Sequence, residues 1–263
     1  MFFTLEKLTA RIPQIIAAAT RAAIPIPVQT HVAPGSANEA AMSPPPAADS
    51  PGWQPLALRE PWGRFPGSTP GALVEMIDWG IPANGGSTHW LQARFRVPEE
   101  WRGQPVLLGM EWQGVGQSSL EAIAYLNGEV LASIDDFHRT VLLPQSAHDG
   151  EQHLLLRCYV PFEQPFGGLE LRLRDETIFQ LGHAMRTVCE VIATYRDSDA
   201  ARHSLLDAVN AAYNTLDLRE GWQSARFAES ARVALQEFRE RLEQMAASTD
   251  SGAGVPRPTL IGT

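Results

Sequence analysis

From Ser87 to Asp175 the chain consists of short apolar segments separated by turn residues. The segments are Trp90-Leu-Gln-Ala-Arg-Phe-Arg-Val97, Gln104-Pro-Val-Leu-Leu-Gly-Met-Glu-Trp112, Ala122-Ile-Ala-Tyr-Leu-Asn-Gly-Glu-Val-Leu131, Arg139-Thr-Val-Leu-Leu143, Gln152-His-Leu-Leu-Leu-Arg-Cys-Tyr-Val160 and Leu169-Glu-Leu-Arg-Leu-Arg174. Each has the length of a β-strand and is bounded by Gly, Pro, Asn or Asp. This spacing predicts an antiparallel β-sandwich of the jelly-roll, galactose-binding-like kind over residues 52–175.

Asn127-Gly128 is the strongest turn signal in this region. A type I′ hairpin needs positive φ at two central residues, which Asn and Gly tolerate best. Period-2 alternation also predicts which leucines face the core of the sandwich. We expect four of them to be buried: Leu126, Leu142, Leu155 and Leu171.

The rest of the chain divides into four further regions. Residues 1–23 predict a short amphipathic helix, in which Pro13 is the one unfavourable residue. Residues 24–51 hold seven of the 20 prolines and predict a proline-rich linker. Residues 176–247 contain no proline and predict a helical connector of three helices. Residues 248–263 begin as a flexible spacer and end as an extended tail.

The three predicted helices carry wide apolar faces. The third is the clearest, because Phe227, Ala231, Leu235, Phe238 and Leu242 recur at helical intervals. We expect the connector to leave an apolar surface larger than a soluble monomer normally exposes, and therefore to mark an interface.

Composition limits the function classes. A net charge of −9 argues against nucleic acid as a partner, because such proteins need a basic surface. The apolar runs are shorter than the ~20 residues that span a bilayer, and the first residues do not have the order of a secretory signal. Cys158 and Cys189 are the only cysteines and are expected to be buried free thiols. We therefore expect a cytoplasmic protein without a membrane partner.

Several segments resemble the amino-terminal part of class II α-mannosidases, glycoside hydrolase family 38, of the cytosolic or vacuolar branch. The most specific is Ser87-Thr-His-Trp-Leu-Gln-Ala-Arg-Phe-Arg-Val-Pro-Glu-Glu-Trp-Arg-Gly103. Ala124-Tyr-Leu-Asn-Gly-Glu129, His138-Arg-Thr-Val-Leu-Leu-Pro144 and the helical region with Asn214-Thr-Leu-Asp217 are also similar to the family. The resemblance covers most of the chain and implies a part of an enzyme that breaks down α-mannosides in N-glycans and free oligosaccharides.

The chain lacks the catalytic motif of that family. The family's His-x-Asp motif supplies a metal ligand and the carboxylate nucleophile in a separate α/β domain. No His-x-Asp occurs in these 263 residues, and the chain stops at Thr263, after a segment that resembles the approach to that domain. We therefore expect no catalytic residue, metal ligand or cofactor in this chain. Zinc is expected in the complete enzyme, which the resemblance implies is a homo-oligomer.

The residues themselves offer little alternative chemistry. His148 and His153 lie five apart around an Asp-Gly turn, which is not zinc-finger spacing, so we expect surface or loop histidines. Asp135 and Asp136 are adjacent, and adjacent residues on an extended chain point to opposite faces. They are therefore expected to form a solvated hairpin end rather than the carboxylate pair of a glycosidase.

Seven tryptophans leave carbohydrate contact open, because indole rings stack on sugar rings and are enriched at interfaces. Trp90 is expected in the core, and Trp101 is expected to pack over the end of the sandwich. Trp79 and Trp112 are the candidates for contact with an oligosaccharide or a partner protein. Two hypotheses follow. One is a non-catalytic part that docks onto the absent catalytic domain, and the other is a free-standing carbohydrate-binding module. An apolar helix face would favour the first, and a groove lined with tryptophan would favour the second.

Overall fold

The computed structural model describes residues 2–32, 44–55, 75–76, 87–112, 121–135, 137–160, 165–197 and 199–250. The chain divides into two compact units. The helical unit comprises Met1–Arg21 and Asp175–Thr263, and the sandwich unit comprises Ala22–Arg174. The chain therefore passes from one unit to the other twice, between Arg21 and Ala22 and between Arg174 and Asp175. Each unit has a hydrophobic core of its own.

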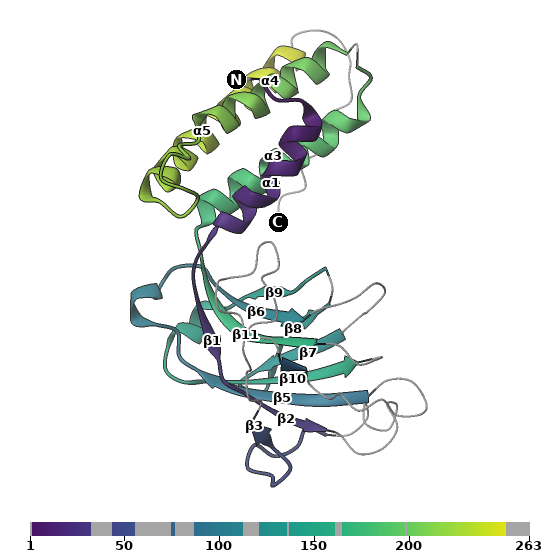
Figure 1. The fold of residues 1–263 in the computed structure, drawn as a ribbon, viewed down its shortest axis with the longest axis vertical. Coiled ribbons are helices and arrows are strands. Elements are labelled where there is room, and N and C mark those ends of the chain that lie inside the picture. The colour runs from purple at the N-terminus through teal and green to yellow at the C-terminus, as the bar shows by residue number, and fades with distance from the viewer. Residues whose placement is uncertain are drawn as a thin grey trace. The chain divides into compact units, whose positions relative to one another are not determined.

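The sandwich unit contains two antiparallel sheets that form a β-sandwich-like body (Figure 1). One sheet has the order β1-β11-β6-β9, with β4 also paired to β11. The other has the order β3-β2-β5-β10-β7-β8. The strands are β1 (Thr20–Ile26), β2 (Val28–Val32), β3 (Gln54–Pro55), β4 (Glu75–Met76), β5 (Ser87–Phe95), β6 (Val106–Trp112), β7 (Glu121–Leu126), β8 (Glu129–Ile134), β9 (Thr140–Leu142), β10 (Gln152–Val160) and β11 (Pro165–Arg174). Two short 3₁₀ turns, η1 (Glu99–Trp101) and η2 (Gln145–His148), complete it.

The predicted hairpin at Asn127-Gly128 is confirmed. Both residues have positive φ, 53° and 89°, and Leu126 pairs with Glu129 across the turn. The Asn127 side chain also joins this turn to β10, because its Oδ1 accepts a hydrogen bond from the His153 amide at 2.9 Å. The turn chemistry of the sequence therefore sets the register of β7 and β8.

The prediction for the four leucines is right for two of them. Leu126 and Leu171 are buried in the sandwich core. Leu142 is 52% exposed, because it pairs with Leu107 on the outer side of β6 while Leu108 faces the core. Leu155 lies on the outer face of its sheet, since Leu154 and Leu156 are the core residues of β10. Because side chains alternate along a strand, a shift of one residue moves the predicted leucine to the opposite face of the sheet.

The helical unit contains α1 (Leu5–Ala18), α3 (Glu176–Thr194), α4 (Ala200–Thr215) and α5 (Ala225–Asp250). The predicted N-terminal helix is present but shorter than predicted, because residues 20–23 already belong to β1. α1 lies along α3 (Figure 1). Gly182 permits this approach, since a Cβ there would stand 2.6 Å from Cγ1 of Ile16. The buried residues of α1 join those of the other three helices in one core.

Part of the stretch predicted as a linker is strand. Residues 24–26 belong to β1, and β2 follows immediately. β1 lies at the edge of its sheet, where Pro25 can be accommodated because an edge strand has one side without ladder partners. The predicted tail at 248–263 lies largely outside the described residues.

Candidate functional site

The two tryptophans predicted to make contacts remain untested. Trp79 lies outside the described residues. Trp112 is the last residue of β6, and its backbone pairs with that of Phe166 on β11, but its side chain is not among those described. Neither can be assigned to a site.

The aromatic cluster that the structure describes is a different one. Trp90 projects from the outer face of the six-stranded sheet and packs with Trp53, Tyr125 and Leu155, away from the sandwich core. Trp90 is only 2% exposed, so it is buried as predicted, but outside the main core. Trp101, predicted to pack over the end of the sandwich, is buried within the main core. Sequence reasoning gave no role to Trp53, which reaches Trp90 from a segment far away along the chain.

Residues 44–55 pack against this outer face. The side chain of Gln92 donates hydrogen bonds to Gln29 Oε1 at 2.7 Å and to the carbonyl of Ala48 at 3.2 Å. The Trp53 indole donates to the carbonyl of Ala47 at 2.8 Å, and its ring lies edge-on to His31. The face therefore combines aromatic rings with side-chain amides, but the ring of Trp90 is already covered.

The histidines are not gathered into a metal site. Within the described ranges, no group of three or more His, Cys, Asp or Glu side chains is placed to hold a metal ion. His153 lies on β10, half-buried. His148 was predicted to be a surface or loop histidine. It is in a 3₁₀ turn but is buried, because η2 packs its neighbour Ala147 into the sandwich core.

The carboxylates with shifted pKa values are tied to local turns. Desolvation raises the pKa of Asp135, but hydrogen bonds from the backbone amides of Phe137 and His138 and from the His138 ring outweigh it, so the pKa is lowered. Asp136 lies outside the described residues. A carboxylate with a lowered pKa stays ionised, whereas the acid of a glycosidase needs a raised pKa.

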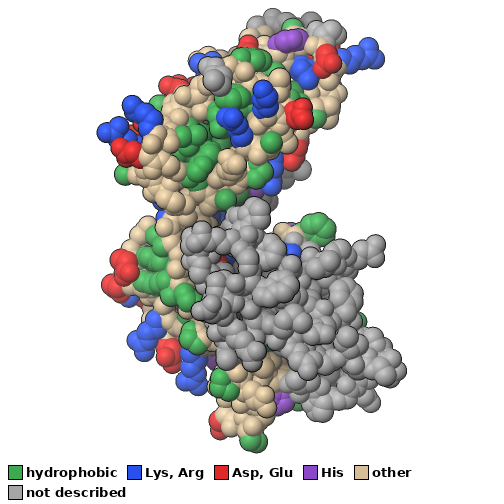
Figure 2. Space-filling view, in the orientation of Figure 1, with side chains coloured by type: hydrophobic (Ala, Val, Ile, Leu, Met, Phe, Trp, Pro, Cys, Tyr) green, Lys and Arg blue, Asp and Glu red, His purple; other side chains and the backbone are tan. Residues whose placement is uncertain are grey.

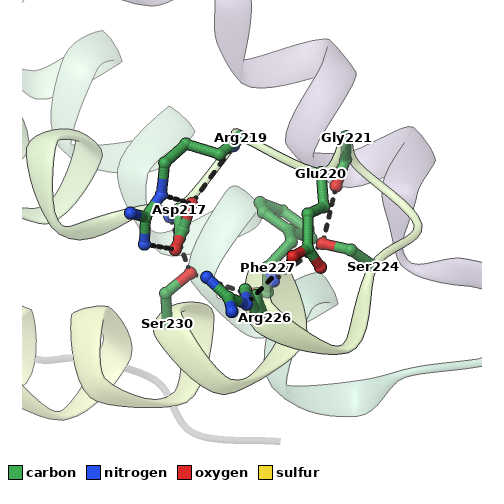
Figure 3. A network of polar contacts seen from close by, with 8 residues as sticks. All are labelled: Asp217, Arg219, Glu220, Gly221, Ser224, Arg226, Phe227 and Ser230. Atoms are coloured by element: carbon green, nitrogen blue, oxygen red, sulfur yellow. Dashed lines mark hydrogen bonds and ion pairs between the residues drawn. The ribbon is translucent and has the colours of Figure 1, made fainter.

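A network of polar contacts links the segment after α4 to the start of α5 (Figure 3). The Arg219 guanidinium hydrogen-bonds the Asp217 carboxylate and lowers its pKa. The backbone amide of Asp217 donates to Ser230 Oγ at 2.9 Å, and Ser224 Oγ accepts from the amide of Phe227 at 3.1 Å. Every one of these bonds fixes the turn or caps α5, which is a structural role.

An open groove of about 340 Å³ lies between α3 and α5. Its polar side chains are already engaged with one another, as in the hydrogen bond of 2.8 Å from Arg239 to Gln180 Oε1. Arg232 in its wall is paired with Glu229 outside it. The groove carries charges of both signs and does not resemble a site built for one ligand.

Both cysteines are free and buried, as predicted. Burial raises the pKa of the Cys158 thiol, and burial raises that of Cys189 to about 11. Thiols with raised pKa values are poor nucleophiles and poor metal ligands at neutral pH.

The most exposed large apolar side chain of the described residues is Phe137, at 92%. It lies in the turn between β8 and β9. Val130, near the start of β8, and Leu142, at the end of β9, are exposed as well. In the helical unit, by contrast, large apolar side chains on α3 to α5 are exposed by at most 42%, at Val191. Figure 2 shows its apolar side chains interspersed with charged ones on the face drawn. The large apolar helical surface that the sequence predicts stays a prediction.

Comparison with known proteins gives only a distant likeness. No family model matches the chain, and no curated protein matches it. Among solved structures, a β-glucuronidase from an uncultured Clostridium species is similar over 60% of this chain and 30% of its own, with 14% identity and a TM-score of 0.35. The chain thus corresponds to less than a third of that enzyme's length. This is a distant structural similarity to a glycoside hydrolase domain and does not identify a family. None of the described helices is long and apolar enough to cross a membrane.

Proposed function

We propose that this chain is a non-catalytic accessory part of an α-mannosidase-type glycoside hydrolase and docks onto the domain that carries the catalytic residues. The chain contributes binding and bracing. Zinc and the carboxylate nucleophile belong to the partner domain, which hydrolyses α-mannosides in oligosaccharides.

One observation carries this proposal. The three segments of residues 87–144 that resemble the mannosidase family all fold within the same body. Ser87–Gly103 forms β5 and η1, Ala124–Glu129 forms the β7–β8 hairpin, and His138–Pro144 contains β9. β5 and β7 pair with the two sides of β10, whereas β9 pairs with β6 in the other sheet. A resemblance carried by one contiguous module is typical of an inherited domain.

The carboxylates with lowered pKa values are held in local hydrogen bonds and ion pairs. Asp135, Asp217 and Glu229 have lowered pKa values, each because of hydrogen bonds from nearby amides or an arginine. Such exposed ion pairs contribute to local structure. Acid–base catalysis instead depends on groups whose pKa is shifted toward the working pH.

The experiment combines two measurements on the purified 263-residue chain. Mixed with a separately expressed class II α-mannosidase catalytic domain, it should co-elute with that domain in gel filtration. Alone, it should not cleave an aryl α-mannoside, with or without added zinc. Turnover that a chelator abolishes, or the absence of a complex, would overturn the proposal.

A free-standing carbohydrate-binding module is the second candidate. The observation in its favour is the gathering of Trp53, Trp90 and Tyr125 with the Gln29–Gln92 amide pair on one sheet face. Rings for stacking and amides for hydroxyl groups are what a sugar needs. Mannose oligosaccharides titrated into the chain should then change its tryptophan fluorescence, and Trp53→Ala should weaken the response. An unchanged spectrum at high oligosaccharide concentration would exclude this candidate.

A further inference from the structure

Residues 44–55 form a strap over the outer face of the six-stranded sheet, and this strap is folded largely on itself. The Ser50 amide donates a hydrogen bond to the carbonyl of Ala47 at 3.0 Å, and the Trp53 amide donates one to the carbonyl of Ser50 at 3.5 Å. The Trp53 indole closes the segment by donating to the carbonyl of Ala47 at 2.8 Å. These three bonds join strap residues to one another, so the strap can leave the sheet as one piece and keep them.

Among the described residues, few contacts attach the strap to the sheet. Its last two residues, Gln54–Pro55, form β3 and pair with β2, and the side chain of Gln92 donates to a strap carbonyl at 3.2 Å. The other contacts are those of the Trp53 ring, which packs on Trp90 and lies edge-on to His31. A segment with so few attachments opens at a lower cost in free energy than a core strand does.

The closed strap also leaves polar atoms without hydrogen bonds. Within the described part of the chain, Thr30 Oγ1 and His31 Nδ1 on β2 and Ser50 Oγ on the strap are buried without a hydrogen-bond partner. A buried polar atom without a partner costs free energy, and exposure to water returns that cost. Opening of the strap is therefore easier than its ring contacts alone would indicate.

We propose that the strap opens while both sheets stay folded, and that its opening exposes the ring of Trp90. In the closed state Trp90 is 2% exposed, and Trp53 is the strap residue that packs against it. A ligand then reaches the Trp90 ring only in the open state, so its apparent affinity is reduced by the fraction of molecules in that state. The inference goes beyond both candidate functions, because it concerns access to the aromatic face and not the identity of a ligand.

The test compares two tryptophans of the full chain by oxidation with N-bromosuccinimide at low dose and mass spectrometry of the peptides. Trp101 is the internal control, because it is 5% exposed but lies in the main core. We expect Trp90 to be modified at least about tenfold faster than Trp101, since Trp101 is reached only when the sandwich itself unfolds. Equal rates at the two tryptophans would overturn the proposal.

Gly52→Ala should shift the strap toward the open state. A Cβ at Gly52 would stand 2.3 Å from His31 Nε2, so the added methyl group pushes the strap away from β2. The ratio of the Trp90 rate to the Trp101 rate should rise about threefold or more. Gly182→Ala is the matched control, because its Cβ would stand 2.6 Å from Ile16 Cγ1 in the helical unit, and it should leave the ratio unchanged. A ratio that Gly52→Ala does not raise would contradict the proposal.

A disulfide supplies the opposite change. Thr30 and Gln54 are paired residues of β2 and β3, and paired Cα atoms of antiparallel strands are about 4.5–5.5 Å apart, which a disulfide accommodates. The double variant Thr30→Cys, Gln54→Cys should, once oxidised, lower the Trp90 rate to about that of Trp101. Reduction should restore the faster rate. A Trp90 rate that stays fast with the strap locked would show that the ring is reached without opening, and the proposal would be wrong.

Discussion

The helical unit and the sandwich unit differ in how far their large apolar side chains are exposed. In the helical unit α1 completes a core with α3, α4 and α5. The large apolar side chains there that stay more than a third exposed are Phe2, at 64%, and, less so, Val191, Tyr195 and Val233. In the sandwich unit the core is equally closed, yet Phe137, Val130 and Leu142 are more than half exposed. Under the proposed function, we expect the binding surface on the sandwich unit, where three large apolar side chains are more than half exposed.

The N-terminal segment, from Phe3 to the end of α1, covers part of the helical core; we call this cover the N-terminal seal. Buried Asn210 on α4 accepts a hydrogen bond from the amide of Phe3 at 2.6 Å and donates one to its carbonyl at 3.0 Å. The Phe3 ring meets Tyr213 edge-on, and the Arg11 guanidinium lies over it at 4.5 Å. An apolar surface that would otherwise attract a partner is thereby covered by the chain itself.

The largest expected effect sharpens this view of the helical core. Phe238 on α5 is fully buried, so Phe238→Ala should lower the free energy of unfolding by about 3–5 kcal/mol. Val233→Ala on the same helix, at a partly exposed position, should cost about 0.5 kcal/mol or less. Urea denaturation measures both. Equal losses would mean that α5 does not pack as described.

The next prediction concerns the two faces of the smaller sheet. Leu171→Ala should cost about 2–5 kcal/mol because Leu171 faces the sandwich core. Leu142→Ala removes the same atoms from an exposed position and should cost about 0.5 kcal/mol or less. A costly Leu142→Ala would show that the outer face of β9 is covered.

The N-terminal seal can be broken at Asn210. Asn210→Ala leaves the amide and carbonyl of Phe3 without partners and should cost about 1–3 kcal/mol. It should also free the N-terminal segment, so that limited proteolysis cuts before α1 more quickly. Asn210→Asp places a buried carboxylate oxygen against the carbonyls of Phe3 and Leu206 and should cost at least as much. Resistance of Asn210→Ala to proteolysis would argue against the seal.

The smallest effect is expected at the exposed pair of Asp217 and Arg219. Because the folded state lowers the pKa of Asp217, its contribution is present above the unfolded pKa and is lost as the pH falls through the folded value. Asp217→Asn should therefore lower the melting temperature slightly at neutral pH and not at all in strong acid. A difference that persists in strong acid would contradict the assignment.

The sequence predicted those elements whose signal is local. Alternation identified the strands, and Asn127-Gly128 identified its turn, because each depends on neighbouring residues. Periodicity could not show that α1 seals the helices, since the bond from Phe3 to Asn210 joins residues 207 positions apart. The linker prediction included residues 24–26 of β1 because proline is unfavourable inside a sheet. β1 lies at a sheet edge, where proline is tolerated, and the sequence alone does not show that position.

The candidate site was harder to predict. Trp53 and Trp90 are in contact because residues 44–55 pack against the sheet, and no sequence motif predicts that packing. Phe137 carried no signal either, because a lone aromatic residue between two strands is as compatible with a core position as with an exposed one. The Asp-x-x-His spacing of Asp135 and His138 was the one available hint of an ordered turn.

Hydrogen exchange of the chain, alone and mixed with the α-mannosidase catalytic domain, tests the central claim most directly. We expect the partner to slow the exchange of amides in residues 129–142, around the β8–β9 turn, and to leave α3, α4 and α5 unchanged. Protection confined to those helices, or none anywhere, would contradict the claim that the sandwich unit is the binding surface.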